Sequence, residues 1–297
     1  MKRAGAIAKR TLLSFYDDQM TQHAAALTYY ALMSLFPAAL LALSLLGIFG
    51  QYPETYDAII GYMRDVVPAS VLGPLDSSLR GALRSQGTAT TALFVSLAAA
   101  LYGTTGALEA ARRALNVTLE VQNGRRFLRR KAIDVASTFV LMTLVLMSLV
   151  LVFVGGGFAR DLLGFVGIGP TAADTFNLLR WPAALLVAML VFAYIYYVTP
   201  DVRQRSFRAV LPGAAVGVVL WLSASYGFSE YISQVVNVGA IYGTFTAAIL
   251  LVVWLWITHV ALLLGAELNA EIERERELAA GVAIEETLNL PTRRGRW

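Results

Sequence analysis

The sequence predicts an all-α, polytopic membrane protein with six transmembrane helices and both termini in the cytoplasm. Of its 297 residues, 57% are apolar and 15% are charged, whereas soluble domains contain about 45–50% and about 25%. The apolar residues are grouped in blocks of about 20, the length that crosses roughly 30 Å of hydrocarbon as a helix. None of these blocks alternates with the period of two that a membrane barrel requires, so helices are the predicted spanning elements.

The blocks differ in small features that bear on packing. The first contains Pro37, which removes one backbone hydrogen bond and is expected to kink its helix. The fifth begins "LPGAAVG", so Gly213 and Gly217 lie one turn apart on one face. Small residues at this spacing favour close helix packing, although they are also compatible with a groove for a solute. The expected spans are about 24–49, 89–110, 132–156, 181–198, 210–232 and 243–267.

Basic residues predict the orientation. An even number of spans puts both termini on one side, and 19 of the 24 Lys and Arg residues fall on that side. Cytoplasmic loops carry such an excess, so both termini are expected in the cytoplasm. Topology and attraction to anionic headgroups, about 1 kcal/mol per residue near the surface, explain the basic excess without nucleic acid.

Two segments outside the spans have their own patterns. Residues 54–85 show apolar residues at helical spacing and predict amphipathic helices at the outer surface, between spans one and two. Residues 276–297 are expected to form a cytoplasmic tail, after a single transmembrane domain over 1–275. The first 22 residues contain four basic residues but no continuous apolar run, which does not fit a cleaved signal peptide.

Carboxylates near the predicted helix ends form one group of candidate positions. Glu109, Asp134 and Glu267 are expected at the cytoplasmic ends of three spans, at the level of several arginines. They could form an ionic ring that ties the helices together, or pairs that break during alternating access. Glu230 could pair with Arg180 on the outer side. The full set of candidate polar positions is Glu109, Asp134, Glu230, His259, Glu267, Asn269 and Glu271.

His259 lies about 12 Å deeper along the helix than Glu267. An imidazole at that depth needs a partner, so we expect a bond to a hydroxyl group on a neighbouring helix, with a proton relay as the alternative. Glu267 and Glu271 are four residues apart and share a helix face, while Asn269 lies on another.

Arginines and aromatic residues make up the remaining candidates. The arginines before the third span are expected to attract an anionic headgroup, and a few residues on the first and sixth spans are placed to line a cavity or to gate it. The headgroup set is Arg112, Arg113, Arg125, Arg126, Arg129 and Arg130, and the cavity set is Tyr29, Tyr30, Pro37 and Tyr242.

Metal and nucleotide chemistry have little support in the sequence. The chain has two histidines and no cysteine, whereas a metal-dependent phosphodiesterase needs several clustered His and Asp ligands. No GxxxxGK[ST] loop occurs, so direct ATP hydrolysis is not expected. We therefore expect no catalytic residues, no metal and no cofactor.

Three stretches together resemble the YihY/BrkB family of bacterial inner-membrane proteins. They are "AAALTYYALMSLFPAALLALSLLG", "RAVLPGAAVGVVLW" and "GAIYGTFTAAILLVVWLWITHVALLLGAELNAE", and "GRRFLRRKAIDV" also fits. The resemblance implies a multi-pass protein of the bacterial cytoplasmic (inner) membrane. Members have been labelled virulence factors or, by historical mislabelling, ribonuclease BN-like enzymes, and some are linked to movement of lipid-like envelope precursors.

The expected function is transport, or assistance with movement, of an amphiphilic envelope molecule such as a lipid or lipid precursor. The alternatives are a non-transporting membrane scaffold or envelope-assembly factor and, more remotely, a membrane-bound ribonuclease. Membrane lipids are the expected partners. Copies of the same chain or envelope-assembly proteins are further options, and no nucleic acid is expected.

Overall fold

A computed structural model of the chain describes residues 2–49, 57, 60–61, 76, 80, 86–121, 125–153, 170–234 and 246–281. Its contacts divide the chain into two compact units, which are described separately below. Unit 1 comprises residues 1–28 and 107–297, and unit 2 comprises residues 29–106. Tyr242, most of the predicted outer helices at 54–85 and most of the predicted tail lie outside the described residues.

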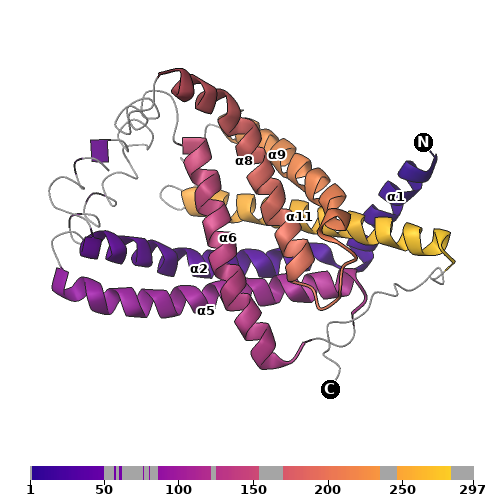
Figure 1. Cartoon of the computed structure of the whole chain (residues 1–297), viewed down its shortest axis with the longest axis horizontal. Helices are drawn as coiled ribbons and strands as arrows, with labels where there is room; N and C mark the ends of the chain where they lie inside the picture. The colour runs from indigo at the N-terminus through magenta and orange to yellow at the C-terminus, as the bar shows by residue number, and fades with distance from the viewer. Residues whose placement is uncertain are drawn as a thin grey trace. The chain divides into compact units, whose positions relative to one another are not determined.

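Every regular element in the described ranges is a helix (Figure 1). Each of the six predicted spans coincides with one long helix. Five of these, α5, α6, α8, α9 and α11, are long and apolar enough to cross a membrane. The elements are α1 (Lys2–Asp17), α2 (Met20–Phe49), α5 (Gln86–Thr118), α6 (Phe127–Phe153), α8 (Pro170–Val198), η1 (Phe207–Val210), α9 (Leu211–Gln234) and α11 (Thr246–Ala279).

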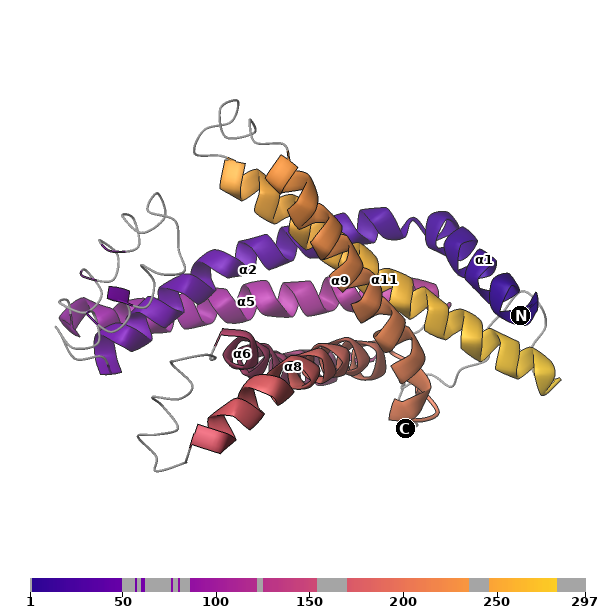
Figure 2. The same ribbon diagram turned by 90° about the horizontal axis from the view of Figure 1, so that it is seen from above.

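The centre of unit 1 is the contact of α9 with α11, which lie against each other along much of their length (Figure 2). Glycines allow this close approach: a Cβ atom on Gly213 would overlap the carbonyl oxygen of Gly265. Tyr196 of α8 joins this contact by donating a 2.5 Å hydrogen bond to the carbonyl of Leu262 on α11. The paired glycines predicted from "LPGAAVG" therefore pack helix on helix, as small residues do in membranes.

Unit 1 also has a large apolar outer surface. The paired helices α6 and α8 pack against each other, yet only 12% of the apolar window of α6 is buried inside the protein. Val145, Leu146 and Val150 of α6 are among the exposed side chains. A helix that is apolar all round and mostly exposed is suited to lipid rather than to water.

Unit 2 contains the greater part of α2 and the first two-thirds of α5. Gly103 and Gly106 of α5 lie against Ser34 and Tyr30 of α2, so closely that a Cβ atom would be 2.9 Å or less from the nearest atom. The helix α2 continues through Pro37. Small residues on α5 thus let the two backbones approach.

The first helix was not expected from the sequence, which we interpreted only as a basic N-terminal arm. In the structure α1 packs on α11, with Thr11 and Phe15 buried. The missed signal is the spacing of Ile7, Thr11, Ser14 and Phe15, because i, i+4, i+7, i+8 is the spacing of one helix face.

Candidate functional site

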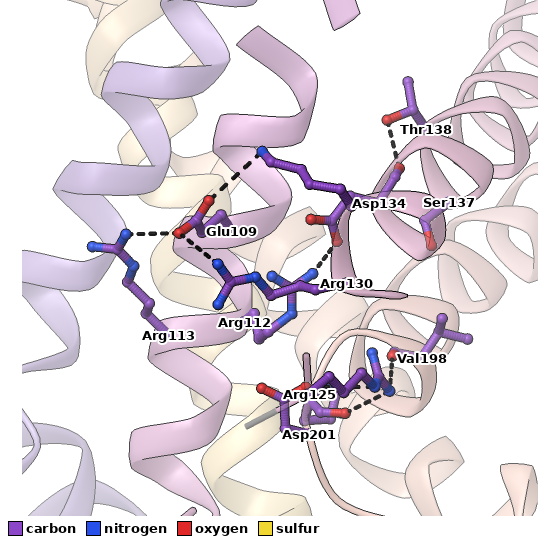
Figure 3. A network of polar contacts seen from close by, with 12 residues as sticks. Glu109, Arg112, Arg113, Arg125, Arg130, Asp134, Ser137, Thr138, Val198 and Asp201 are labelled. Carbon is purple, nitrogen blue, oxygen red and sulfur yellow. Dashed lines mark hydrogen bonds and ion pairs between the residues drawn. The ribbon is translucent and has the colours of Figure 1, made fainter. Parts of the chain in front are cut away.

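A cluster of ion pairs joins the C-terminal half of α5 to α6 and to the loop after α8 (Figure 3). It contains five cations and three carboxylates, all in unit 1. We call it the ion-pair cluster, and its members are Glu109, Arg112, Arg113, Arg125, Arg130, Lys131, Asp134 and Asp201.

The centre of the cluster is the contact between Arg112 of α5 and Asp134 of α6. Their side chains are 3% and 2% exposed, and the Nε and Nη1 atoms of Arg112 are buried without a hydrogen-bond partner. Ser137, one turn further along α6, is also buried and accepts a 3.1 Å bond from the hydroxyl of Tyr194. A buried pair of this kind fixes how two helices sit together more than it adds stability.

Glu109 lies at the edge of the cluster and faces three cations. Its carboxylate accepts a 2.8 Å bond from Arg113, one turn further along the same helix. Arg130 and Lys131 of α6 approach it at 3.9 and 3.8 Å. Of the three carboxylates in the predicted ionic ring, Glu109 and Asp134 pair with cations between α5 and α6, whereas Glu267 bonds instead to the hydroxyl of Thr118.

Arg125 holds the end of α8. Its Nη2 atom donates to the carbonyl oxygens of Val198 and Pro200 at 2.9 and 3.0 Å, and its Nε lies 3.4 Å from Asp201. These carbonyls lie at the C-terminal end of α8, where a cation also complements the helix dipole. Asn116 completes the arrangement, because its amide exchanges two hydrogen bonds with Asp201.

Beyond the cluster, α5 ends in a left-handed residue. Glu120 has a φ of 54°, and Val121 N–H bonds to Asn116 O while Glu120 N–H bonds to Val117 O. This is the hydrogen-bond pattern of a Schellman motif, whose left-handed position usually holds glycine. Here a glutamate occupies it, and its carboxylate accepts a 2.7 Å bond from Arg274 of α11.

The carboxylates of α11 meet α5 and α1. Glu267 is buried and accepts a 2.8 Å bond from the hydroxyl of Thr118. Glu271, also buried, accepts from Arg10 at 2.9 Å and from Ser14 at 3.3 Å. The sequence placed Glu267 and Glu271 on one helix face, and in the structure Glu267 bonds to α5 while Glu271 bonds to α1. The α1 partners of Glu271 were missed because α1 itself was missed.

Asp18, in the turn between α1 and α2, belongs to the same region. Burial raises the pKa of its carboxyl group above the usual value, and the nearby carboxylates of Glu120 and Asp17 raise the pKa further. Arg274 opposes this shift. The surroundings of Asp18, above all its burial, thus disfavour its negative charge.

Two polar residues within α11 have structural partners. His259 Nδ1 lies 3.0 Å from the hydroxyl of Thr28, which itself donates to the carbonyl of Ala24. The hydroxyl proton of Thr28 is already used in the bond to Ala24, so the imidazole N–H of His259 is the donor to the Thr28 oxygen. Asn269 accepts from Gly213 N–H at 2.8 Å and donates to Val210 O at 2.9 Å. It therefore secures the start of α9.

One further expectation differs from the structure. Glu230 does not meet Arg180: it accepts a 2.6 Å bond from Gln234, while Arg180 bonds to Val152 O and lies over the ring of Trp181. The two side chains have nearer partners within their own neighbourhoods, so that predicted pair is wrong. In unit 2, Tyr29 is exposed and Tyr30 lies against Gly106, which packing explains without a cavity.

The six arginines proposed for headgroup binding have very different surroundings. Arg112 and Arg125 are buried in ion pairs, so a headgroup cannot reach them in this conformation. Arg126 and Arg129 are exposed, and between them Phe127 and Leu128 are exposed as well. This four-residue stretch, the RFLR segment (126–129), offers both charge and apolar surface.

A depression of about 560 Å³ lies beside the ion-pair cluster, at the C-terminal end of α5. The residues that line it come from one face of the end of α5 and from the residues that follow this helix. It is rimmed by one cation and one carboxylate, Arg113 and Glu120, with an amide and two valines between them. The lining residues are Arg113, Asn116, Val117, Glu120 and Val121.

Within the described ranges, no group of three or more His, Asp or Glu residues is arranged to hold a metal ion. The described polar side chains instead form ion pairs and hydrogen bonds between helices. What this arrangement can do chemically is bind anionic groups at its exposed arginines and change helix contacts by exchanging ion-pair partners.

Comparison with known proteins fits these features. A model of the virulence factor BrkB family matches residues 11–286. The chain belongs to this family. The resemblance drawn from the sequence motifs is therefore confirmed, and the membrane nature of the chain agrees with the names of other members.

Three relatives of this chain illustrate the range of names. A UPF0761 membrane protein of Pseudoalteromonas translucida is 30% identical over 87% of this chain and 83% of its own length. The ribonuclease-like protein YfkH of Bacillus subtilis is 28% identical over 86% and 90%. A UPF0761 membrane protein of Xanthomonas campestris is 25% identical over 88% and 59%. No solved structure matches the chain.

Proposed function

We propose that this protein crosses the bacterial cytoplasmic membrane six times, with both termini in the cytoplasm, and moves or helps to move an anionic amphiphile of the envelope. The first crossing would be α2, whose 30 residues coincide with the first predicted span. No enzymatic step is part of this proposal. The amphiphile would be a lipid or lipid precursor, and no nucleic acid would take part.

The proposal rests mainly on the RFLR segment, which lies beside the ion-pair cluster, where cations outnumber carboxylates. Arg126 and Arg129 are exposed, and Phe127 and Leu128 are exposed between them. An anionic headgroup favours the guanidinium groups, whereas the acyl chains favour the apolar side chains. The RFLR segment offers both kinds of contact within four residues, where the apolar part of α6 begins.

The neighbouring ion-pair cluster would couple the binding of a headgroup to a movement of the helices. Five cations face three carboxylates there, so an added anion would find unbalanced positive charge. Glu109 already has three cationic neighbours, and an incoming phosphate could compete for them. Exchange of partners at the contact of α5 with α6 would then couple headgroup binding to a shift of the helices.

A non-transporting scaffold is the second candidate, and one observation favours it. The small-residue face of α9, which could have formed a groove for acyl chains, is closed by α11 at Gly213 and Gly265. Any path for acyl chains would then run along the exposed faces of α6 and α8 rather than between α9 and α11. The ribonuclease name belongs to a relative and has no support in the described side chains.

Lipid movement in vesicles tests the proposal. Purified protein is reconstituted with a fluorescent anionic lipid or a fluorescent zwitterionic lipid, and the rate of transfer between leaflets is measured. We expect wild type to accelerate the anionic lipid over protein-free vesicles. The double variant Arg126→Gln/Arg129→Gln should slow this by about 30-fold at low lipid concentration, because each charge contributes about 1 kcal/mol.

The matched control removes two exposed arginines elsewhere in unit 1. Arg203→Gln/Arg208→Gln carries the same loss of charge in the loop between α8 and α9, and its rate should stay within about twofold of wild type. Equal losses in both double variants would mean a general effect of charge. Rates no faster than in empty vesicles would favour the scaffold.

A further inference from the structure

The helix α1 has one face that is held against α11. Thr11 and Phe15 are buried there. Arg10 donates to Glu271 at 2.9 Å and to Glu275 at 2.7 Å, and Ser14 donates to Glu271 at 3.3 Å. These contacts fix the rotation of α1 about its own axis. They therefore also determine which side chains lie on its other face.

The other face of α1 carries large apolar side chains that are exposed. Leu12, Leu13 and Tyr16 are 62%, 53% and 80% exposed, and Lys9 is exposed one turn before them. Positions 9, 12, 13 and 16 have the i, i+3, i+4, i+7 spacing of a single helix stripe. Three such side chains on one stripe indicate a surface that meets something other than water.

The charges of α1 indicate what it meets. The helix contains Lys2, Arg3, Lys9 and Arg10 against a single carboxylate at Asp17. Arg10 is engaged by the carboxylates of α11, so the remaining charge of α1 is positive. Leucines, a tyrosine and a lysine on one stripe are typical of helices that lie at a lipid surface, because lysine stems and tyrosine rings are apolar with polar tips.

We propose that the stripe Lys9, Leu12, Leu13 and Tyr16 of α1 docks into an anionic lipid surface at this end of the protein. The chain's own path supports a lipid occupant, since α2 begins at Met20, four residues after Tyr16. The stripe is therefore fixed close to the level where the chain enters a long apolar helix. The RFLR segment of α6 repeats the pattern of exposed apolar and basic residues in the same unit. This inference is independent of what the protein moves.

The chain contains no cysteine, so single cysteines can be labelled without background. Leu12→Cys and Tyr16→Cys would each carry an environment-sensitive fluorophore in the full-length protein. The control is Ala279→Cys, on the last turn of α11, which is also exposed. Each labelled protein is reconstituted in phosphatidylcholine vesicles with or without phosphatidylglycerol, and quenching by nitroxide groups on the lipids is recorded.

We expect emission at positions 12 and 16 to shift to the blue and to be quenched by the lipid nitroxides, while position 279 stays water-like. Phosphatidylglycerol should strengthen the effect. Lys9→Gln should lower the docked-to-undocked ratio about fivefold, the value of one charge near an anionic surface.

Three results would overturn the proposal. Water-like emission at 12 and 16, equal to that at 279, would show that no lipid covers the stripe. Quenching with no response to phosphatidylglycerol or Lys9→Gln would contradict the role of anionic lipid. Disulfide formation between copies at position 12, together with protection that rises with protein density, would assign the stripe to a second copy of the chain.

Discussion

Replacing Gly213 by alanine is expected to disrupt the contact of α9 with α11 and to cost about 3 kcal/mol or more, the upper part of the range for overpacked cores. The added Cβ would overlap the carbonyl oxygen of Gly265 and the side-chain amide of Asn269. The first obstacle is backbone, so no rotamer change relieves it. The second is the amide that holds the start of α9, so the substitution would also weaken that contact.

Thermal unfolding in detergent, followed by size-exclusion profile, measures this effect. The matched control is Gly227→Ala on the same helix, where nothing lies within 4 Å of an added Cβ. It removes the same kind of residue without a collision, so its midpoint should equal that of wild type or exceed it slightly. If Gly213→Ala unfolded at the same temperature as Gly227→Ala, the close approach of α9 and α11 would be refuted.

Removal of Asp134 is expected to have the second large effect. Asp134→Ala leaves the guanidinium of Arg112 buried without its carboxylate, and an uncompensated buried charge costs about 3–5 kcal/mol. The side chains are 3% and 2% exposed, so water cannot replace the lost partner without opening the contact of α5 with α6. We expect a strong fall in the unfolding midpoint and in the yield of monodisperse protein.

Two further variants separate this cause from general damage. Arg112→Met/Asp134→Leu removes both charges and should recover most of the loss, because a buried pair can be replaced by apolar residues at little cost. Arg113→Ala removes an arginine whose side chain is 72% exposed, and it should cost less than about 1 kcal/mol. A double variant less stable than Asp134→Ala would contradict the explanation by buried charge.

The helices could be predicted because their signals are local. Six apolar blocks coincide with six long helices, and the glycines of α9 lie where their spacing indicated. The helices extend beyond the predicted spans: α11 continues to Ala279, twelve residues past the end of the sixth span. The charged continuation is held by Arg10, Glu120 and Arg205, which bond to its side chains. These partners come from distant parts of the chain and leave no local pattern.

The candidate site was predictable in composition but not in pairing. Glu109 and Asp134 were expected among cations at helix ends, and the structure places them there. The sequence could not tell a buried arginine from an exposed one: Arg125 and Arg126 are neighbours, yet one caps α8 and the other is exposed. Burial depends on which helix packs opposite, and the spacing of residues within one segment does not encode that.

The ion-pair cluster and the α11 carboxylates share one element, the C-terminal end of α5. It bonds to α6 through Arg112, to the loop after α8 through Asn116, and to α11 through Thr118 and Glu120. Leu115 and Leu119 of the same end also pack in apolar cores. Ion pairs can exchange partners while such apolar packing is kept, and the proposed movement of an anionic lipid would require an exchange of this kind.

The orientation of this junction is tested most directly by labelling cysteines in intact cells. Ala279→Cys gives a single exposed thiol in a chain that has none, and a membrane-impermeant maleimide reports which side it faces. We predict labelling only after the membrane is permeabilised. Rapid labelling of intact cells would place the exposed arginines and the end of α11 outside the cytoplasm, which would contradict a site that collects anionic lipid from the cytoplasmic leaflet.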